Sequence, residues 1–440
     1  MDSSPEERMS LRSKSPRSNQ GISRRTVLRR LAAVPLAAGL GQSPLFTKSA
    51  PRIAVVGAGA FGGWTALHLR NRGAQVVLVD ARGAGNALSS SGGRSRVIRA
   101  IYGADRIYSE MVKRAFGLWK TLDASTEEQL YVETGALWMN RSDDAYVRSA
   151  LPILADLGFA VDKLTLGEAA RRYPQIDFRG LHSVWFERRA GALQAQRCCM
   201  AVRDAFQKAG GSYQTAQVRP GEIVNGSLSG LKLDDGSRLD ADIYVFACGP
   251  WLGQMFPGVL GNAIRPTRQE VHYFTIPRPE RYRAGRLPIW IDFGERIVYG
   301  VPDIDGRTLK VADDTRGEPV DPSNVDRVPR KAAIERTRKF LAERFPELAN
   351  APLHAGWICQ YENSPDGHLI IDRHPEAGNA WFVGGGSGHG FKLAPVVGEI
   401  VAERLMAAKE VPETFRLARL RDVVKPSTQF EKNERPPNRE

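Results

Sequence analysis

Short apolar runs and stretches with helical spacing alternate along the chain from residue 51 onward. Residues 52–56 form one apolar run, and residues 75–80 form a second run that ends in an acid. Between them, apolar side chains recur at helical spacing over residues 64–69, and Gly73 follows. A strand, a helix and a second strand are therefore predicted, which is the order of a βαβ unit with parallel strands.

The same patterns predict elements in the rest of the chain. Helical spacing covers residues 106–122, 195–209, 324–344 and 394–405. Alternating or β-rich runs cover residues 131–138, 212–218, 241–247, 271–276, 287–292, 296–301, 307–312 and 380–383. Strands and helices mixed in this way predict an α/β fold.

Composition limits the class of protein. On a prior of about 100–200 residues per domain, 440 residues suggest two or three domains. Hydrophobic residues make up 42% and charged residues 25%, which excludes bulk disorder and a multi-span membrane protein. Four cysteines exclude a disulfide scaffold, and with seven scattered histidines no metal site is predicted.

The net charge of +13 is concentrated at the two ends of the chain. Residues 1–50 hold nine Lys and Arg against three Asp and Glu, and residues 416–440 hold seven against four. Residues 51–415 therefore carry a net charge of +4. Because this surplus is small and unclustered, nucleic acid is not expected as a partner.

The ends also differ from the rest in sequence. Ser23-Arg24-Arg25-Thr26-Val27-Leu28-Arg29 precedes an apolar run over residues 31–40, which is shorter than the roughly 20 residues of a membrane-spanning helix. This order resembles a twin-arginine export signal, so residues 1–50 are expected to be a disordered tail with that signal. Export by the twin-arginine machinery implies a periplasmic or otherwise extracytoplasmic location; a plain basic tail is the alternative. Residues 409–440 are expected to be a C-terminal tail that is disordered after about Arg416.

A glycine-rich motif connects the first predicted strand to the first predicted helix. It reads Gly57-Ala58-Gly59-Ala60-Phe61-Gly62, and Asp80 ends the next strand. Gly57 permits a tight turn, Gly59 lets the backbone approach a pyrophosphate at the helix N-terminus, and Gly62 lets helix and strand pack closely. Asp80 would accept hydrogen bonds from ribose hydroxyls. A dinucleotide cofactor is predicted, either NAD or FAD.

Two later segments favour FAD. The strand over 241–247 ends near Gly249-Pro250, and the strand over 380–383 continues into a loop with five glycines between residues 384 and 390. Such loops leave backbone N–H groups free to face a flat ligand or an anion.

Together these motifs resemble the monomeric sarcosine oxidase group of FAD-dependent amine oxidases, within the D-amino-acid-oxidase-like fold. The resemblance extends from Arg52 to about Leu405. Besides the fingerprint, it rests on residues 93–103, 308–314, 357–361, 368–372 and 387–392. It implies a discontinuous Rossmann-type FAD-binding domain over 51–104, 193–262 and 352–408. It also implies an α+β substrate domain with an antiparallel or mixed sheet over 105–192 and 263–351.

The resemblance assigns roles to residues outside the fingerprint. Arg96 is expected to lie against the flavin, and Arg99 and Lys392 to bind the substrate carboxylate, for which a guanidinium offers a planar fork. Val218 would contact the adenine side. The remaining cofactor contacts implied are Ser95, Gly249, Gly388, Gly390, Phe391 and again Lys392.

Two further residues carry chemistry in the resembled enzymes. Lys310, on a predicted strand, would assist oxygen reduction, because a fixed cation in a dry site stabilises superoxide. Cys359 stands where those enzymes carry a thioether to the flavin, so covalent FAD is one expectation and an ordinary buried cysteine the other. Cys198, Cys199 and Cys248 are expected to be core residues.

Asp314 departs from the resembled pattern, which has a histidine beside the substrate amine. A carboxylate there could bind an ammonium or accept a proton, or it could be a turn residue that never contacts substrate. We therefore expect a monomeric oxidase of a small amino acid or N-alkyl amino acid, with O2 or another electron acceptor as partner. A dehydrogenase that passes electrons to a quinone or carrier, and a flavin-binding protein without turnover, remain as alternatives.

Overall fold

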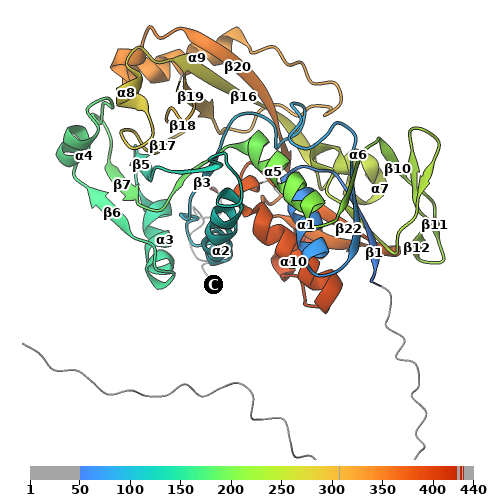
Figure 1. Ribbon diagram of the computed structural model, residues 1–440. Coiled ribbons are helices and arrows are strands. Elements are labelled where there is room, and N and C mark those ends of the chain that lie inside the picture. Colours follow the sequence, from blue (N-terminus) through green and yellow to red (C-terminus); the bar gives the residue numbers. More distant parts are fainter. Residues whose placement is uncertain (1–49, 307, 424–426, 429, 431–440) are drawn as a thin grey trace, which may run out of the picture. The chain divides into compact units, whose positions relative to one another are not determined.

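The computed structural model describes residues 50–306, 308–423, 427–428 and 430. A six-stranded sheet forms around the first βαβ unit, in the order β21-β22-β15-β1-β2-β9 (Figure 1). Its strands are β1 Arg52–Val56, β2 Gln75–Asp80, β9 Ser212–Thr215, β15 Ile243–Phe246, β21 Ile370–His374 and β22 Ala377–Gly384. All neighbours are parallel except β21 and β22. The predicted Rossmann-type sheet is confirmed.

Three helices pack together beside this sheet. They are α1 Ala60–Asn71, α5 Ala195–Lys208 and α10 Ala394–Ala407, and α1 contacts both of the others. Gly398 of α10 lies so close to α1 that an added Cβ would be 2.6 Å from the carbonyl carbon of Trp64. Small residues at this crossing therefore set the separation of the two helices.

A second, eight-stranded sheet has the order β20-β16-β19-β18-β17-β5-β7-β6. Its strands are β5 Ala136–Asn140, β6 Val161–Leu164, β7 Ser183–Glu187, β16 Arg265–Thr275, β17 Ile289–Phe293, β18 Ile297–Val301, β19 Thr308–Asp313 and β20 Leu353–Asn363. β5 and β17 are parallel and the other pairs are antiparallel, so the sheet is mixed as predicted. Helix α9 (Lys331–Arg344) packs its Phe340 on Trp290 of this sheet, with ring centroids 5.2 Å apart.

Smaller elements complete the fold. A three-stranded sheet joins β3 Arg96–Ile98, β8 Gly191–Leu193 and β4 Tyr131–Glu133. The remaining strands are β10 Val218–Pro220, β11 Ile223–Val224, β12 Ser227–Leu228, β13 Leu231–Leu233 and β14 Arg238–Leu239. The remaining helices are α2 Arg106–Asp123, α3 Ala145–Asp156, α4 Leu166–Arg172, α6 Leu252–Met255, α7 Pro257–Leu260 and α8 Pro279–Tyr282.

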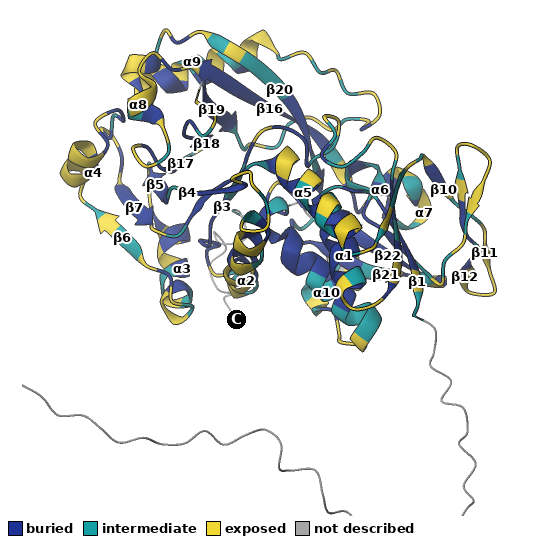
Figure 2. Cartoon of the chain, in the orientation of Figure 1, coloured by how far each residue is buried: buried dark blue, intermediate teal, exposed yellow. Residues whose placement is uncertain are grey.

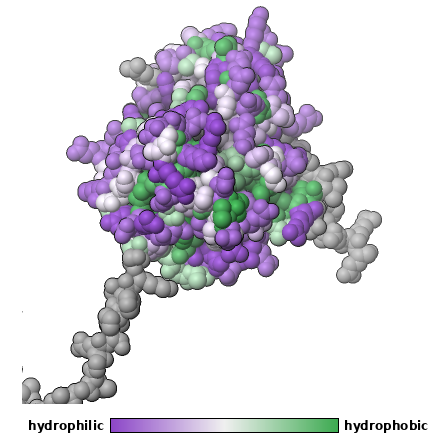
Figure 3. Space-filling view, turned by 90° about the vertical axis from the view of Figure 1, so that its right-hand side faces the viewer, coloured by the Kyte–Doolittle hydropathy of each residue, from purple (hydrophilic) through white to green (hydrophobic). Residues whose placement is uncertain are grey.

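Buried residues follow the strands of both large sheets, except the edge strands β6 and β9, and the inner faces of α1, α2 and α10 (Figure 2). Trp64 of α1 and Trp119 of α2 meet edge to face at 5.2 Å, which ties these two helices together. The face in Figure 3 is mainly hydrophilic, with hydrophobic residues in small groups. No helix among the described residues is long and apolar enough to cross a membrane.

Several predicted elements have different bounds in the structure. The run 131–138 splits at Gly135, which has φ +70°, into β4 and β5 of different sheets. The run 212–218 likewise splits into β9 and β10. The helix predicted over 324–344 begins only at Lys331, because Pro329 disfavours helical backbone at Val328 and lacks the N–H that a helix interior needs.

The predicted boundary at residue 352 does not coincide with the point where the chain changes from one large sheet to the other. The segment 352–408 was expected to belong entirely to the cofactor domain, yet β20 is a strand of the eight-stranded sheet and pairs with β16 along its whole length. The chain crosses to the six-stranded sheet only after Asn363. The division into two domains stays a prediction, since the described residues from 50 onward form a single compact unit.

The C-terminal segment is ordered for longer than predicted. Val411 and Phe415 are buried, and beyond Arg416, where disorder is predicted, Arg419 forms an ion pair of 2.8 Å with Asp366. Apolar side chains four residues apart give this segment a face that packs on the core. The predicted export signal lies outside the described residues.

Glycines of the βαβ turn are required by close contacts. Gly57 has φ +101°, and a Cβ on Gly62 would lie 1.8 Å from the carbonyl oxygen of Gly57. Gly117, on an exposed face of α2, has no atom within 4 Å of an added Cβ. The two positions form a matched pair for substitution.

Gly62→Ala is expected to lower the free energy of unfolding by at least about 2 kcal/mol, because the methyl group forces α1 away from the turn. Gly117→Ala is expected to raise it by about 0.5–1 kcal/mol, since alanine loses less backbone entropy in a helix. Urea unfolding of both variants measures this. Equal effects at the two positions would contradict the close packing at Gly62.

Candidate active site

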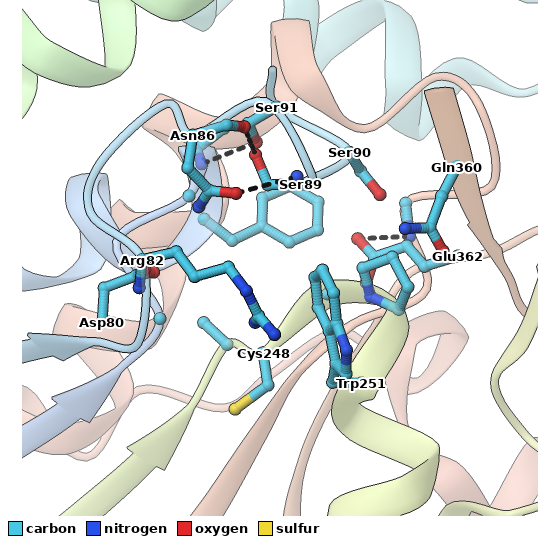
Figure 4. A pocket seen from close by; sticks show the side chains of 18 of the residues that line it. Asp80, Arg82, Asn86, Ser89, Ser90, Ser91, Cys248, Trp251, Gln360 and Glu362 are labelled. Atoms are coloured by element: carbon cyan, nitrogen blue, oxygen red, sulfur yellow. Dashed lines mark hydrogen bonds between the residues drawn. The ribbon is translucent and has the colours of Figure 1, made fainter. Parts of the chain in front are cut away.

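A cavity opens at the carboxyl ends of β1, β2, β15 and β22 (Figure 4). Crevices at this edge of an open parallel sheet are where such folds bind ligands. The predicted cofactor residues that line it are Gly57, Gly59, Ala60, Phe61, Asp80, Arg96, Val218, Gly249, Gly388, Gly390 and Phe391. Strands distant in sequence therefore bring most of the predicted set to one cavity.

The other predicted cofactor residues lie just outside this lining. Ala58 donates its backbone N–H to Asp80, and Gly62 packs beneath the turn. The carbonyl of Ser95 accepts hydrogen bonds from two cations of the site. Cys359 lies beside Arg96, and Lys392 lines a second cavity.

The carboxylate of Asp80 organises the turn that it faces. Its Oδ2 accepts the N–H of Ala58 at 2.7 Å, and its Oδ1 accepts the N–H groups of Arg82 and Gly83, both at 2.8 Å. These bonds fix the two loops on either side of the cavity. A carboxylate has about four lone-pair sites, so Asp80 can still accept a further hydrogen bond from a ligand in the cavity.

Several lining residues had no signal in the sequence motifs. Ser91 Oγ accepts the N–H of Ala60 at 3.0 Å, so it holds the N-terminus of α1 in place. The guanidinium of Arg82 lies over the ring of Trp251 at 5.1 Å and closes one side of the cavity (Figure 4). Gln360 and Glu362, at the end of β20, line the opposite side. Only the pairing of β20 in the second sheet brings them here.

Arg96 is held by main-chain oxygens. It donates to the carbonyls of Ser90 and Gly92, both at 2.7 Å, and of Ser95 at 2.8 Å. Its Nη2 also lies 3.4 Å from Sγ of Cys359. Arg96 thus connects the loop before β3 to the strand that carries the cysteine.

A second cavity shares Arg96, Tyr361, Gly388 and Phe391 with the first, so the two are contiguous. It is further lined by Val97, Arg99, Ile291, Ile297, Tyr299, Asp314, His389, Lys392 and Phe430. The predicted substrate residues Arg99, Asp314 and Lys392 therefore lie together. The predicted catalytic residue Lys310 is beside them, behind Tyr299.

Arg99 is buried among aromatic rings. Its guanidinium lies 4.7 Å from the ring centroid of Tyr102 and 5.0 Å from that of Trp138, and it donates to the carbonyl of Ile101. Glu187, which is fully buried, accepts from Ala100 and from the indole of Trp138. Burial raises the pKa of Glu187, although the charge of Arg99 opposes this rise.

Lys392 is fixed from two sides. Its Nζ donates to the hydroxyl of Tyr102 at 3.0 Å and to the carbonyl of His389 at 2.9 Å. Burial, and then the charge of Arg99, hold the pKa of Lys392 well below its usual range. A bound anion would reverse this effect by favouring the charged ammonium.

Lys310 is 3% exposed, and its Nζ donates to the carbonyl of Ser95 at 2.9 Å. The ammonium also lies 5.3 Å from the ring centroid of Tyr299. Burial, and then the charge of Arg96, lower the pKa of Lys310 to about 7. This lysine therefore changes charge near neutral pH.

Asp314 follows β19 and faces the second cavity, whereas its neighbour Asp313 forms an ion pair with Arg296. Its Oδ1 accepts the hydroxyl of Tyr361 at 2.7 Å. Burial raises the pKa of Asp314, and the bond from Tyr361 opposes the rise. Of the two interpretations of Asp314, its position favours contact with a ligand over a turn residue.

Phe430 was expected to belong to a disordered tail, but it lines the second cavity. Its ring packs on Tyr146 and Phe293, with centroids 5.3 and 5.5 Å away, and lies 5.6 Å from the guanidinium of Arg99. An isolated phenylalanine in a polar segment carries no pattern that could have identified it. Among the described residues, no group of three His, Cys, Asp or Glu is placed to hold a metal ion.

Comparisons with known proteins found a family model and relatives that match most of the chain. A protein-family model described as FAD dependent oxidoreductase matches residues 52–404. Monomeric sarcosine oxidase from Bacillus sp. (strain B-0618) is 29% identical over 365 residues, which cover 81% of this chain and 92% of that protein. N-methyl-L-tryptophan oxidase from Salmonella arizonae is 28% identical, covering 83% and 98%.

Solved structures show the same fold. L-proline dehydrogenase from P. horikoshii superposes with a TM-score of 0.72 at 23% identity, covering 85% of this chain and 98% of that one. Amadoriase I from Aspergillus fumigatus superposes with a TM-score of 0.71 at 22% identity, covering 85% and 91%.

Proposed function

Because the chain belongs to the family of FAD dependent oxidoreductases, we propose that it oxidises a small amino acid or N-alkyl amino acid with O2. In the proposed reaction, a carbon bonded to the amine nitrogen loses a hydride, and water hydrolyses the resulting imine. O2 takes up the two electrons and leaves as hydrogen peroxide. When bound, FAD supplies the two-electron oxidant that accepts the hydride. The observation that carries the proposal is the set Arg99, Lys392 and Asp314 in a cavity contiguous with the cofactor cavity.

The cofactor cavity fits FAD. The turn at Gly57 and Gly62 is so tight that neither position has room for a side chain. The turn lies at the N-terminus of α1, where a pyrophosphate is stabilised. Gly388 approaches Tyr361 so closely that an added Cβ would lie 2.7 Å from the ring, which leaves a flat surface. The turn would hold the pyrophosphate, Asp80 the ribose, and Arg96 and Phe391 the ring system.

Arg99 and Lys392 are suited to bind a carboxylate. They lie in one cavity and are both nine-tenths or more buried, so their charges are little screened. A carboxylate would replace the present acceptors of these cations, the main-chain oxygens of Ile101 and His389. The substrate class proposed is therefore an amine that also carries a carboxylate.

Asp314 is suited to take a proton from the substrate amine. Hydride loss requires the neutral amine, because an ammonium has no lone pair to stabilise the developing imine. The raised pKa of Asp314 makes its carboxylate a stronger base than an exposed aspartate. The proton would stay on Asp314, which the hydroxyl of Tyr361 holds in place.

Lys310 is suited to assist the transfer of electrons to O2. The ammonium of Lys310 changes charge near neutral pH, since burial lowers its pKa to about 7. In its charged form it would stabilise the anion that forms from oxygen. A dehydrogenase, the alternative function, has no need of this charge.

Anaerobic mixing with amino acids and N-methyl amino acids tests the proposed reaction. At least one member of the panel is expected to bleach the flavin absorbance. Arg99→Met is expected to raise the KM of that substrate by about tenfold to a hundredfold, through loss of charge-assisted hydrogen bonds. A matching amine without a carboxylate should show no such change.

Arg188→Met serves as the control for this variant, because Arg188 is exposed and paired with Asp162. No bleaching by any amine would contradict the proposed reaction. An equal loss of affinity for substrates with and without the carboxylate would contradict the role of Arg99.

The rate of flavin reoxidation by O2 is expected to fall as pH rises through about 7, because Lys310 then loses its proton. Stopped-flow measurement from about pH 6 to about pH 9 covers the transition. Lys310→Gln should react slowly and without this pH dependence, whereas Lys331→Gln, at an exposed site, should match the parent. A parent rate independent of pH, or one as slow as in Lys310→Gln, would instead favour the dehydrogenase.

We also propose that Cys359 would hold FAD covalently through a thioether to a methyl carbon of the flavin. The C–S bond would replace the S–H bond and one C–H bond of that methyl group, and the two electrons and two protons released would leave with O2 as hydrogen peroxide. In support, Sγ lies 3.4 Å from Arg96, a residue that lines both cavities. Acid-precipitated protein is expected to remain yellow, and Cys359→Ala protein to lose its colour to the supernatant. Cys248→Ala is the control, because Cys248 lines the same cofactor cavity. A colourless parent precipitate would rule out the thioether.

A further inference from the structure

Glu362 stands next to the last residue of β20 but extends away from its own sheet. Its carboxyl group lies against the ends of the six-stranded sheet: Oε2 is 3.7 Å from a Cβ added at Gly249 and 3.6 Å from one added at Gly384. It therefore reaches the same edge as the cofactor cavity, which it lines (Figure 4).

One oxygen of this carboxyl group is bonded and the other is not. Oε1 accepts the backbone N–H of Gly386 at 3.3 Å. Oε2 is inaccessible to solvent and has no hydrogen-bond partner among the described residues. The residue is 7% exposed, and no described Lys, Arg or His forms an ion pair with it. A buried oxygen left in this way destabilises the protein unless a ligand supplies its partner.

The protonation state of Glu362 indicates what that partner must be. Burial without a cation raises the pKa of Glu362 to about 8, so the neutral acid is the main form at neutral pH. Since Oε1 accepts a hydrogen bond, Oε2 carries the hydrogen and is a donor. FAD offers acceptors along its whole length, on phosphates, hydroxyls and ring carbonyls, whereas an ionised carboxylate would be repelled by the phosphates.

We propose that Glu362 binds FAD as a neutral acid, donating a hydrogen bond from Oε2 to an acceptor atom of the cofactor. No described residue competes for this hydrogen, because Oε2 has no hydrogen-bond partner among them. The proposal concerns retention of the cofactor. It does not depend on which amine is oxidised or on how electrons leave.

Two substitutions separate this role from a structural one. Glu362→Gln keeps a donor of the same shape, whereas Glu362→Met keeps the approximate volume and removes the donor. Both are made in a Cys359→Ser background, so that FAD is exchangeable even if the thioether forms in the parent. The FAD-bound proteins are diluted, and the release of FAD is followed by the rise in flavin fluorescence.

Glu362→Met is expected to release FAD about tenfold faster than the background protein, and Glu362→Gln within about threefold of it. Glu376→Met, at an exposed site, is the control. Thermal unfolding with saturating FAD and without it should show a larger loss with FAD. The empty protein loses only the 3.3 Å bond from Gly386, and removal of the unsatisfied Oε2 offsets that loss.

Unchanged release from Glu362→Met, or equally fast release from Glu362→Gln, would overturn the proposal. So would an equal loss of stability with and without FAD, which would show that Glu362 stabilises the loop at Gly386 instead of binding the cofactor. If Glu362→Met is not recovered folded, Glu362→Leu removes the same donor and is judged by the same outcomes.

Discussion

Burial of positive charge is the constraint on which this site depends. Arg99, Lys310 and Lys392 are each 5% exposed or less, and Arg96 is partly buried beside them. Removing such groups from water costs several kcal/mol each unless they find partners. Here the partners are main-chain carbonyls and aromatic faces rather than adjacent carboxylates. These partners satisfy hydrogen bonds but do not neutralise charge. Burial therefore lowers the pKa of Lys310 and of Lys392, and an anionic ligand would favour their charged forms.

The loop before β3 is where this arrangement is assembled. The carbonyl of Ser95 accepts from Arg96, which faces the cofactor cavity, and from Lys310, which belongs to the eight-stranded sheet. One carbonyl thus couples the positions of two cations from different parts of the fold. Strand β3 pairs with neither large sheet and belongs to the three-stranded sheet with β8 and β4.

Sequence reasoning predicted the parts of the site that are local in the chain. The fingerprint and Asp80 lie within one βαβ unit, where glycine spacing and strand ends follow from the turn geometry. Residues distant in the chain that the structure brings together, such as Arg99, Asp314 and Lys392, were predicted only through the family resemblance. Where the resemblance named no residue, long-range pairing left no signal. Glu362 reaches the cofactor cavity only because β20 pairs with β16, and Phe430 only because the C-terminal segment packs back on the core. Neither position has a local periodicity that distinguishes it from an ordinary polar or apolar residue.

The balance of charge in the second cavity also bears on the substrate. Arg99 and Lys392 favour an anion, while Asp314 and the buried Glu187 provide negative charge nearby. Burial raises the pKa of both acids and lowers that of Lys392, so the empty cavity favours fewer charges in total. A ligand that brings both a carboxylate and an amine restores the pairing: the carboxylate makes Lys392 more basic, and the amine can pass its proton to Asp314. An uncharged amine interacts only with Asp314, and a carboxylate alone interacts only with Arg99 and Lys392. An amino acid interacts with all three residues and therefore fits the cavity better than either.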